Sequence, residues 1–104
     1  MYTLDEIQNR VQEAIDAYNA TASFDAQIAR VFLFGSYAEG LQTEKSDIDL
    51  LVKFNAPVVS FFSLARVLDA MERHLDAPVD IVQDPLPHDA LLDIKKRIPL
   101  YEAA

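Results

Sequence analysis

Residues 28–34 form a short apolar run, rich in β-branched and aromatic side chains, that ends at once in Gly35 and Ser36. Such a run predicts a buried strand that breaks into a turn. Gly35 can adopt backbone dihedrals that other residues avoid, and Ser36 then places a hydroxyl and a backbone N–H at the start of a short helix. Because helix N-termini favour anions, the segment predicts a sheet protein in which one strand leads into a turn suited to phosphate.

Helical and strand-like patterns alternate along the rest of the chain. Thr3 and Glu6 have the spacing of a capping box, and apolar residues then recur at helical intervals. Ser60 can cap a second helix, and Pro87 can start a third whose last turn would hold three basic residues, Lys95, Lys96 and Arg97. The expected elements are helices over residues 4–20, 60–75 and 87–97 and strands over residues 28–34, 47–54, 79–82 and 98–101. They predict an α/β (α+β) fold in which a mixed β-sheet of three to five strands is flanked by helices, with the helices on one side.

Length, charge and composition narrow the class of protein. A chain of 104 residues is expected to form one domain, residues 1–104. Nine basic and 17 acidic residues give a net charge of −8, which argues against autonomous binding of DNA or RNA. The absence of cysteine excludes disulfides, thiolate metal sites and thiol nucleophiles. The chain shows no signal-peptide pattern and no apolar stretch long enough for a membrane span, so we expect a cytoplasmic protein.

Three aspartates lie where strands are expected. Asp47 and Asp49 are two residues apart, so their side chains point to the same face of a strand. Asp80 stands alone among apolar residues of another strand, where a carboxylate has no evident structural use. Carboxylate oxygens are the ligands that Mg²⁺ prefers. Together with the turn at Gly35, the three aspartates predict a site for a divalent cation bound with a nucleoside triphosphate.

These features occur in the order typical of a known superfamily. The pattern is a Gly-Ser turn, a second glycine, an Asp-x-Asp pair about ten residues on and a later strand aspartate, here Gly35-Ser36, Gly40, Asp47 with Asp49, and Asp80. In this the chain resembles the nucleotidyltransferase superfamily that includes DNA polymerase β, and within it the minimal nucleotidyltransferase (MNT) proteins. The resemblance extends from the first strand to the closing Ile98–Glu102 segment and implies the small nucleotidyltransferase fold.

The resemblance also implies roles for individual residues. Asp47 and Asp49 would hold two Mg²⁺ (or Mn²⁺) ions, and Asp80 would complete the shell of the catalytic ion and help to activate the incoming hydroxyl. Gly35, Ser36 and Gly40 would form the turn that binds the phosphates of ATP. An AMP unit would then be transferred and pyrophosphate released.

One position departs from the pattern of the superfamily. Its members often carry arginine where this chain has Glu39, and a carboxylate there would repel a triphosphate if it faced the phosphates. Lys45 in the adjacent loop is interpreted as a solvated lysine.

The acceptor of the AMP unit is expected to come from a second chain, because larger family members use an additional helical domain to complete the acceptor pocket. By resemblance, that partner is a helical HEPN-domain toxin, and the chain is the antitoxin of a type VII-like toxin-antitoxin pair that modifies a tyrosine of the toxin. Two alternatives remain open at this point. The chain could modify a small molecule such as an aminoglycoside, or it could be a non-catalytic MNT module that neutralises its partner by binding alone.

Other conspicuous residues receive structural interpretations. His74 and His88 have no partner histidines at ligand spacing and are expected at the surface. Phe61 and Phe62 are expected to pack in the core and not against a nucleobase.

Overall fold

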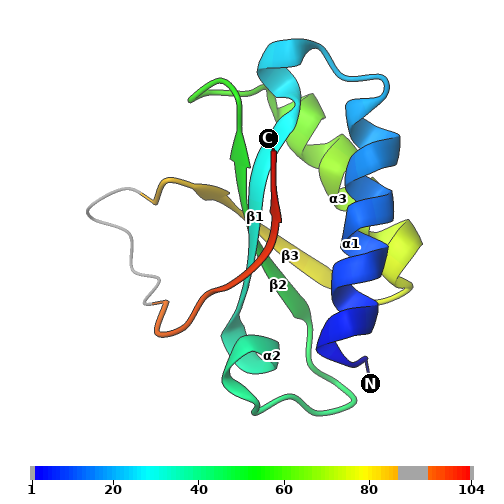
Figure 1. Ribbon diagram of the computed structural model, residues 1–104, viewed down its shortest axis with the longest axis vertical. Helices are drawn as coiled ribbons and strands as arrows, with labels where there is room; N and C mark the ends of the chain where they lie inside the picture. Colours follow the sequence, from blue (N-terminus) through cyan, green and yellow to red (C-terminus); the bar gives the residue numbers. More distant parts are fainter. Residues whose placement is uncertain (1, 87–93, 104) are drawn as a thin grey trace.

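The computed structural model describes residues 2–86 and 94–103. Four strands form one sheet in the order β3-β2-β1-β4, in which β1 is antiparallel to β2 and β4, and β2 is parallel to β3. The elements in chain order are α1 (Leu4–Asn19), a 3-10 turn (Phe24–Ala26), β1 (Ile28–Phe34), α2 (Gly35–Glu39), β2 (Ile48–Phe54), α3 (Phe61–Leu75), β3 (Val79–Asp84) and β4 (Ile98–Glu102). Figure 1 shows α1 and α3 on the same side of the sheet. The mixed sheet with helices on one side is confirmed.

The two long helices begin at the residues that the sequence indicates. Thr3 Oγ1 accepts a hydrogen bond from the backbone N–H of Glu6 at 3.2 Å, and Glu6 Oε1 accepts one from the N–H of Thr3 at 3.1 Å, which completes the capping box. Ser60 Oγ likewise accepts from the N–H of Ser63 at 3.1 Å. These bonds satisfy N–H groups that the first helical turn leaves without partners.

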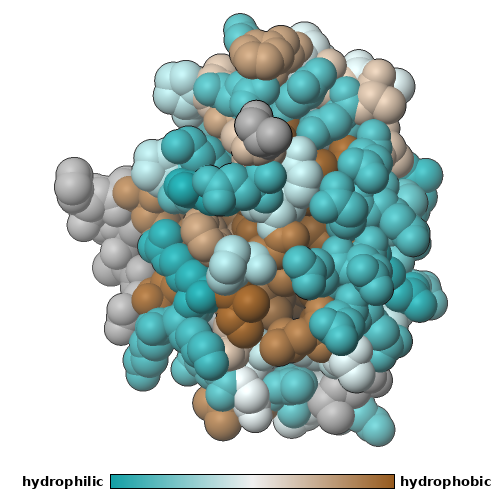
Figure 2. All heavy atoms as spheres, in the orientation of Figure 1, coloured by the Kyte–Doolittle hydropathy of each residue, from teal (hydrophilic) through white to brown (hydrophobic). Residues whose placement is uncertain are grey.

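The core lies between the helices and one face of the sheet. Residues one helical turn apart on α1 and α3 are buried there, together with alternate residues of β1 and β2, among them Ile7, Val11, Val67, Met71, Val31, Leu33, Leu50 and Val52. The outer face of α1 is hydrophilic in Figure 2, and apolar atoms are visible between this helix and the sheet. Because side chains alternate along a strand, the residues between those of the core point to the opposite, open face of the sheet.

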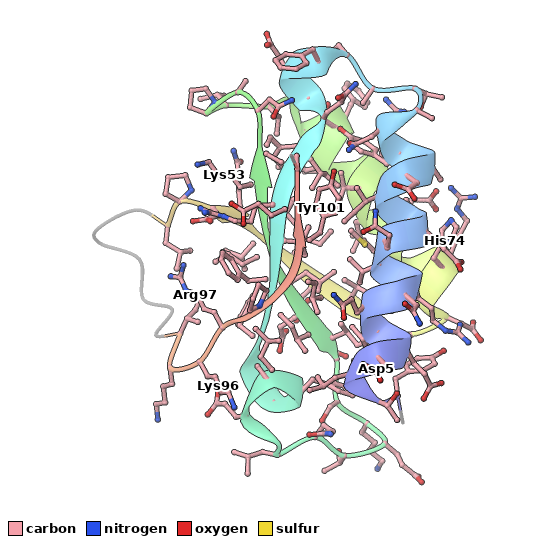
Figure 3. All side chains as sticks on the ribbon, in the orientation of Figure 1. Asp5, Lys53, His74, Lys96, Arg97 and Tyr101 are labelled. Carbon is pink, nitrogen blue, oxygen red and sulfur yellow. The ribbon has the colours of Figure 1, made fainter. Side chains whose placement is uncertain are left out.

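The open face of the sheet carries both charged and apolar side chains. It carries Asp49, Leu51 and Lys53 from β2 and Phe32 and Phe34 from β1. Leu51 and Phe34 are buried although they do not belong to the core under the helices. In Figure 3, Lys53, Lys96 and Arg97 lie on the side of the sheet away from α1.

Several expectations about boundaries are wrong. Residues 94–97 are not helical, so Lys95, Lys96 and Arg97 do not form the last turn of a helix; residues 87–93 of that expected helix lie outside the described residues. The strand β2 begins at Ile48 and not at Asp47, and β3 continues to Asp84 instead of ending at residue 82. The edge strand after Arg97 is confirmed as β4.

The two neighbouring phenylalanines are not core residues. Phe61 and Phe62 are each 80% exposed in the first turn of α3, before the buried stripe that begins at Val67. The core interpretation of both is therefore wrong, because both side chains project from the first turn of α3 into solvent and the buried residues of this helix begin later, at Val67. None of the helices among the described residues is long and apolar enough to cross a membrane.

Candidate nucleotide and metal site

The turn between β1 and α2 depends on Gly35 for two reasons. Its φ of +72° lies in the left-handed region that other residues rarely adopt. A Cβ atom at this position would also overlap Asp49 Oδ2 and lie 2.9 Å from Asp49 Cγ. The absence of a side chain at Gly35 therefore allows the β1–α2 turn to approach the carboxylate of Asp49 directly.

The short helix α2 places Ser36 at the same end of the sheet. Tyr37 and Ala38 are buried and hold this helix against the core, while Ser36 remains partly exposed. Gly40 ends α2 with a φ of +75°, and the N–H of Leu41 donates to the carbonyl of Ser36 at 2.9 Å. No atom lies within 4 Å of the position that a Cβ of Gly40 would take. The conformation of Gly40 therefore serves the chain reversal and not a close contact.

Asp49 and Asp80 are direct neighbours across the parallel strands β2 and β3. Residues paired in this register point to the same face, so both carboxylates lie on the open face of the sheet, beside the Gly35 turn. Asp49 is partly buried and Asp80 is exposed. The geometry brings together a carboxylate pair from two strands and a turn from a third.

The ionisation of Asp49 reflects this crowding. Burial, followed by the negative charges of Asp80 and Asp47 and a hydrogen bond with Asp80, together raise its pKa from 3.8 to about 6. A carboxylate beside two others is costly to ionise without a cation. The cluster therefore favours either a shared proton or a bound positive charge.

Asp47 takes a different position from the other two aspartates. It precedes β2 and is exposed, and it acts on Asp49 through its charge. Within residues 2–86 and 94–103, no group of three or more His, Cys, Asp or Glu side chains is arranged to hold one metal ion. The structure thus pairs Asp49 with Asp80 and leaves Asp47 at the entrance to β2.

Glu39 and Lys45, on either side of the loop after α2, are both exposed. Glu39 is the last residue of α2. Lys45 lies in a tight turn in which the N–H of Thr43 donates to Ser46 Oγ at 2.8 Å. Exposure of both side chains is consistent with the solvated interpretation of Lys45.

Sequence reasoning missed a group of charged residues farther along the open face. Asp84 is 8% exposed and pairs with Arg30 at 3.5 Å, and the guanidinium groups of Arg30 and Arg97 lie 5.2 and 5.9 Å from the ring centre of Phe32. Lys53 lies opposite Asp84 in the register. The alternation that places Asp49 on this face also places Lys53 there, and that signal was available in the sequence.

Known proteins are similar in sequence to this chain over most of its length. The sequence model of the family described as "Nucleotidyltransferase domain" matches residues 16–102. A Methanocaldococcus jannaschii protein named "Putative protein adenylyltransferase MJ1379" is 34% identical over 101 residues, which cover 94% of this chain and 93% of that protein. A second protein of the same organism, "Putative protein adenylyltransferase MJ1215", is 33% identical over 84 residues, covering 79% of this chain and 90% of that one.

Solved structures with the same fold are also found. One is described as "Crystal structure of the toxin-antitoxin with AMP-PNP"; it has a TM-score of 0.70 and 21% identity, and covers 92% of this chain and 73% of that one. Another is a tri-AMPylated Shewanella oneidensis HEPN toxin in complex with MNT antitoxin, with a TM-score of 0.59, 17% identity, and coverage of 93% and 71%. These likenesses confirm the small nucleotidyltransferase fold. Because the family match extends over most of the sequence, from residue 16 to residue 102, the chain belongs to the nucleotidyltransferase domain family.

Proposed function

We propose that this chain transfers AMP from ATP to a tyrosine hydroxyl of a helical HEPN-domain toxin and is thereby the antitoxin of a type VII-like pair. The observation that carries the proposal is the Asp49–Asp80 pair on one sheet face, with the Gly35 turn packed directly against Asp49. The names of the M. jannaschii relatives support protein adenylylation. The toxin-antitoxin complexes with the same fold support the choice of partner.

The carboxylates of Asp47, Asp49 and Asp80 are suited to a divalent metal ion. All their donor atoms are hard oxygens, and the pKa of Asp49 is raised first by burial and then by repulsion from Asp80 and Asp47, a repulsion that a cation would relieve. In this proposal Asp49 and Asp80 hold Mg²⁺ or Mn²⁺ from their paired strand positions, and the exposed Asp47 joins them as a ligand when the metal binds. When bound, the metal neutralises the triphosphate and lowers the pKa of the acceptor hydroxyl.

The residues of this chain have separate tasks in the proposed reaction. Gly35 keeps the β1–α2 turn free of a side chain, so that backbone N–H groups and the Ser36 hydroxyl can donate to the phosphates that leave as pyrophosphate. Gly40 reverses the chain after α2 and so completes the nucleotide-binding turn. Asp80 is exposed at the edge of the sheet, where its carboxylate can accept the proton of an acceptor hydroxyl. In this proposal residues 1–104 act as one catalytic domain, and the partner supplies the other wall of the acceptor pocket.

The test combines this chain with a candidate HEPN-domain partner protein, ATP and Mg²⁺. Intact-mass spectrometry should show the partner heavier by one or more AMP units. Asp49→Asn and Asp80→Asn should each remove most of the transfer and leave the two chains associated. Asp69→Asn is the matched control, because Asp69 is an exposed aspartate on α3 that pairs with Arg73.

Three other outcomes have distinct meanings. Transfer of AMP to an aminoglycoside in place of the partner would establish the small-molecule alternative. A stable complex with an unmodified partner, even with MnATP, would establish the non-catalytic module. Full activity of Asp49→Asn and Asp80→Asn would contradict the assigned site.

A further inference from the structure

An open groove lies between α3 and β3, on the face of the sheet that the helices cover. It has a volume of about 380 Å³. Its lining is largely apolar and includes Phe61, Leu64, Ala65 and Leu68 of α3 and Val79, Ile81 and Gln83 of β3. Phe61 is 80% exposed, at the start of α3. An apolar groove with an exposed aromatic ring is typical of a surface that another molecule covers.

The strand beside the groove has backbone groups that point away from the sheet. Among the described residues, β3 is an edge strand with β2 as its one neighbour. The N–H of Ile48 donates to the carbonyl of Pro78 at 3.0 Å, which fixes the phase of the parallel ladder. Every second residue from Pro78 onward therefore bonds to β2, and the residues between them direct their N–H and carbonyl groups outward. Ile81 and Gln83 are two of these outward residues.

The outward backbone groups and the groove belong to the same residues. Val79 is the third outward residue, and its N–H donates to Glu72 Oε2 of α3 at 3.4 Å. The side chains of Val79, Ile81 and Gln83 all line the groove. A strand laid along β3 could therefore bond to the backbone of Ile81 and Gln83 and place every second side chain in the groove.

Charge indicates which kind of strand fits this edge. Glu72 and Asp76 are exposed on and just after α3, and Asp80 is exposed on the open face of β3. Within the part of the chain that the structure describes, no basic side chain lines the groove. A second copy of this chain would bring the same carboxylates to the edge, and each copy has a net charge of −8. The edge therefore favours a basic segment of another protein over a β3–β3 dimer.

We propose that the edge of β3 and the groove beside it form a docking site for an extended, basic segment of a partner protein. The segment adds to the sheet as a further strand. Its apolar side chains fill the groove, and a lysine or arginine lies near Glu72. The inference goes beyond the proposed function, because strand addition requires neither ATP nor a metal ion.

The first experiment uses a phage-displayed library of random peptides, selected against the wild-type chain without ATP or metal. Peptides of about ten residues are long enough to extend along the whole of β3. The enriched sequences should alternate apolar with other residues and carry lysine or arginine near one end. A selection that enriches no sequence, or sequences without this alternation, would refute the docking site.

Phe61 and Phe62 provide a matched pair of variants for the groove. Both are 80% exposed and adjacent on α3, so neither substitution removes buried contacts. Phe61 lines the groove beside β3, whereas Phe62 lines a separate groove with Tyr18 and Arg66. In fluorescence anisotropy, Phe61→Ser should weaken binding of an enriched synthetic peptide at least about tenfold, and Phe62→Ser less than about twofold. Equal effects of the two variants would refute the groove as the binding surface.

A second pair of variants tests the charge. Glu72→Gln keeps an oxygen that can accept from the N–H of Val79 and removes the negative charge. It should weaken peptide binding by about two- to fivefold, whereas Glu13→Gln on α1 should leave it unchanged. Equal affinities of Glu72→Gln and the wild-type chain would contradict the selection of a basic segment.

Strand addition itself is tested by hydrogen exchange of single amides, followed by NMR. The N–H groups of Ile81 and Gln83 should exchange at least about tenfold more slowly with the peptide bound, and the N–H of Val82, which bonds to β2, should change little. N-methylation of alternate peptide residues should abolish binding in one phase of the alternation and retain it in the other. Binding without protection of Ile81 and Gln83 would refute strand addition.

The other occupant is tested by analytical ultracentrifugation of the chain alone. The chain should be monomeric. A dimer that is lost in Phe61→Ser and retained in Phe62→Ser would assign the edge to a second copy and overturn the inference. Because none of these measurements contains ATP, failure of the docking site and failure of AMP transfer are observed separately.

Discussion

Substitution of Gly35 by alanine tests the contact between the β1–α2 turn and Asp49, and Gly40→Ala is its matched control. Both glycines have nearly the same left-handed φ, +72° and +75°. An L-residue in this conformation costs about 1–2 kcal/mol, so both variants carry that cost. A Cβ at Gly40 meets no atom within 4 Å, whereas a Cβ at Gly35 would overlap Asp49 Oδ2 and crowd its Cγ at 2.9 Å.

The difference in stability between the two variants measures the effect of the close approach between residue 35 and Asp49. Moving Asp49 from its rotamer and shifting the adjacent backbone costs about 1–3 kcal/mol. We therefore expect Gly35→Ala to lower the free energy of unfolding by about 2–5 kcal/mol and Gly40→Ala by about 1–2 kcal/mol. Domains of this size are stable by about 5–15 kcal/mol, so both variants should still fold.

Urea denaturation followed by circular dichroism measures these free energies. Asp49→Ala removes the oxygen and Cγ that a Cβ of residue 35 would meet and leaves its own Cβ at 3.2 Å. In the Asp49→Ala background, the loss of unfolding free energy caused by Gly35→Ala should be smaller by about 1–3 kcal/mol. A double-mutant cycle measures this difference as a coupling energy between the two positions. Equal costs at Gly35 and Gly40, or no coupling with Asp49, would refute the argument that the turn approaches the carboxylate.

The remaining predictions concern charge at the same site. Because burial and neighbouring charge raise the pKa of Asp49 from 3.8 to about 6, the metal-free folded state binds more protons than the unfolded state between these values. The stability that this group contributes is present below about pH 4 and is lost as the pH rises through about 6. Allowing for solvent screening, the loss should be about 1–2 kcal/mol, and urea titrations from pH 4 to 8 should show it in the wild-type chain and not in Asp49→Asn. Mg²⁺ or Mn²⁺ with ATP should raise the melting temperature in a thermal-shift assay, since a ligand of the folded state stabilises it. The double variant Asp47→Asn with Asp49→Asn should abolish that rise, and an equal rise would contradict the metal site. Glu39 is exposed at the end of α2, so Glu39→Arg should tighten MgATP binding by less than about fivefold in calorimetry; a much larger gain would mean that Glu39 faces the phosphates.

Local features of the fold were readable from the sequence because they depend on neighbouring residues. The capping box of Thr3 and Glu6, the cap at Ser60 and the strand that ends at Gly35 each involve groups within a few positions of one another. The apolar periodicity likewise identified the buried sides of α1 and α3. The ends of helices and strands were predicted less accurately. For example, β3 extends to Asp84 because it pairs with β2, and no local sequence pattern indicates that pairing.

Some features depended on packing between distant segments. Phe61 and Phe62 are large apolar residues of the kind found in cores, yet both are exposed in the first turn of α3. Their exposure depends on how α3 packs against the rest of the molecule, which the local sequence does not show. The ion pair of Arg30 with Asp84 joins residues 54 positions apart, and nothing near either residue signals the other. Residues 95–97 have basic side chains suited to a helix C-terminus, and the chain there instead leads directly into β4.

The candidate site divides between these two kinds of information. The sequence by itself determined the residue types: two aspartates spaced for one strand, a third in another strand, and a Gly-Ser turn after the first apolar run. Only the tertiary structure decided that β3 pairs with β2 in parallel with Asp80 opposite Asp49, and that Gly35 lies against the same carboxylate. Side-chain alternation is a property of each strand alone, whereas strand order and register come from burial of the whole sheet under α1 and α3. A shift of one residue between β2 and β3 would turn Asp80 to the opposite face of the sheet from Asp49.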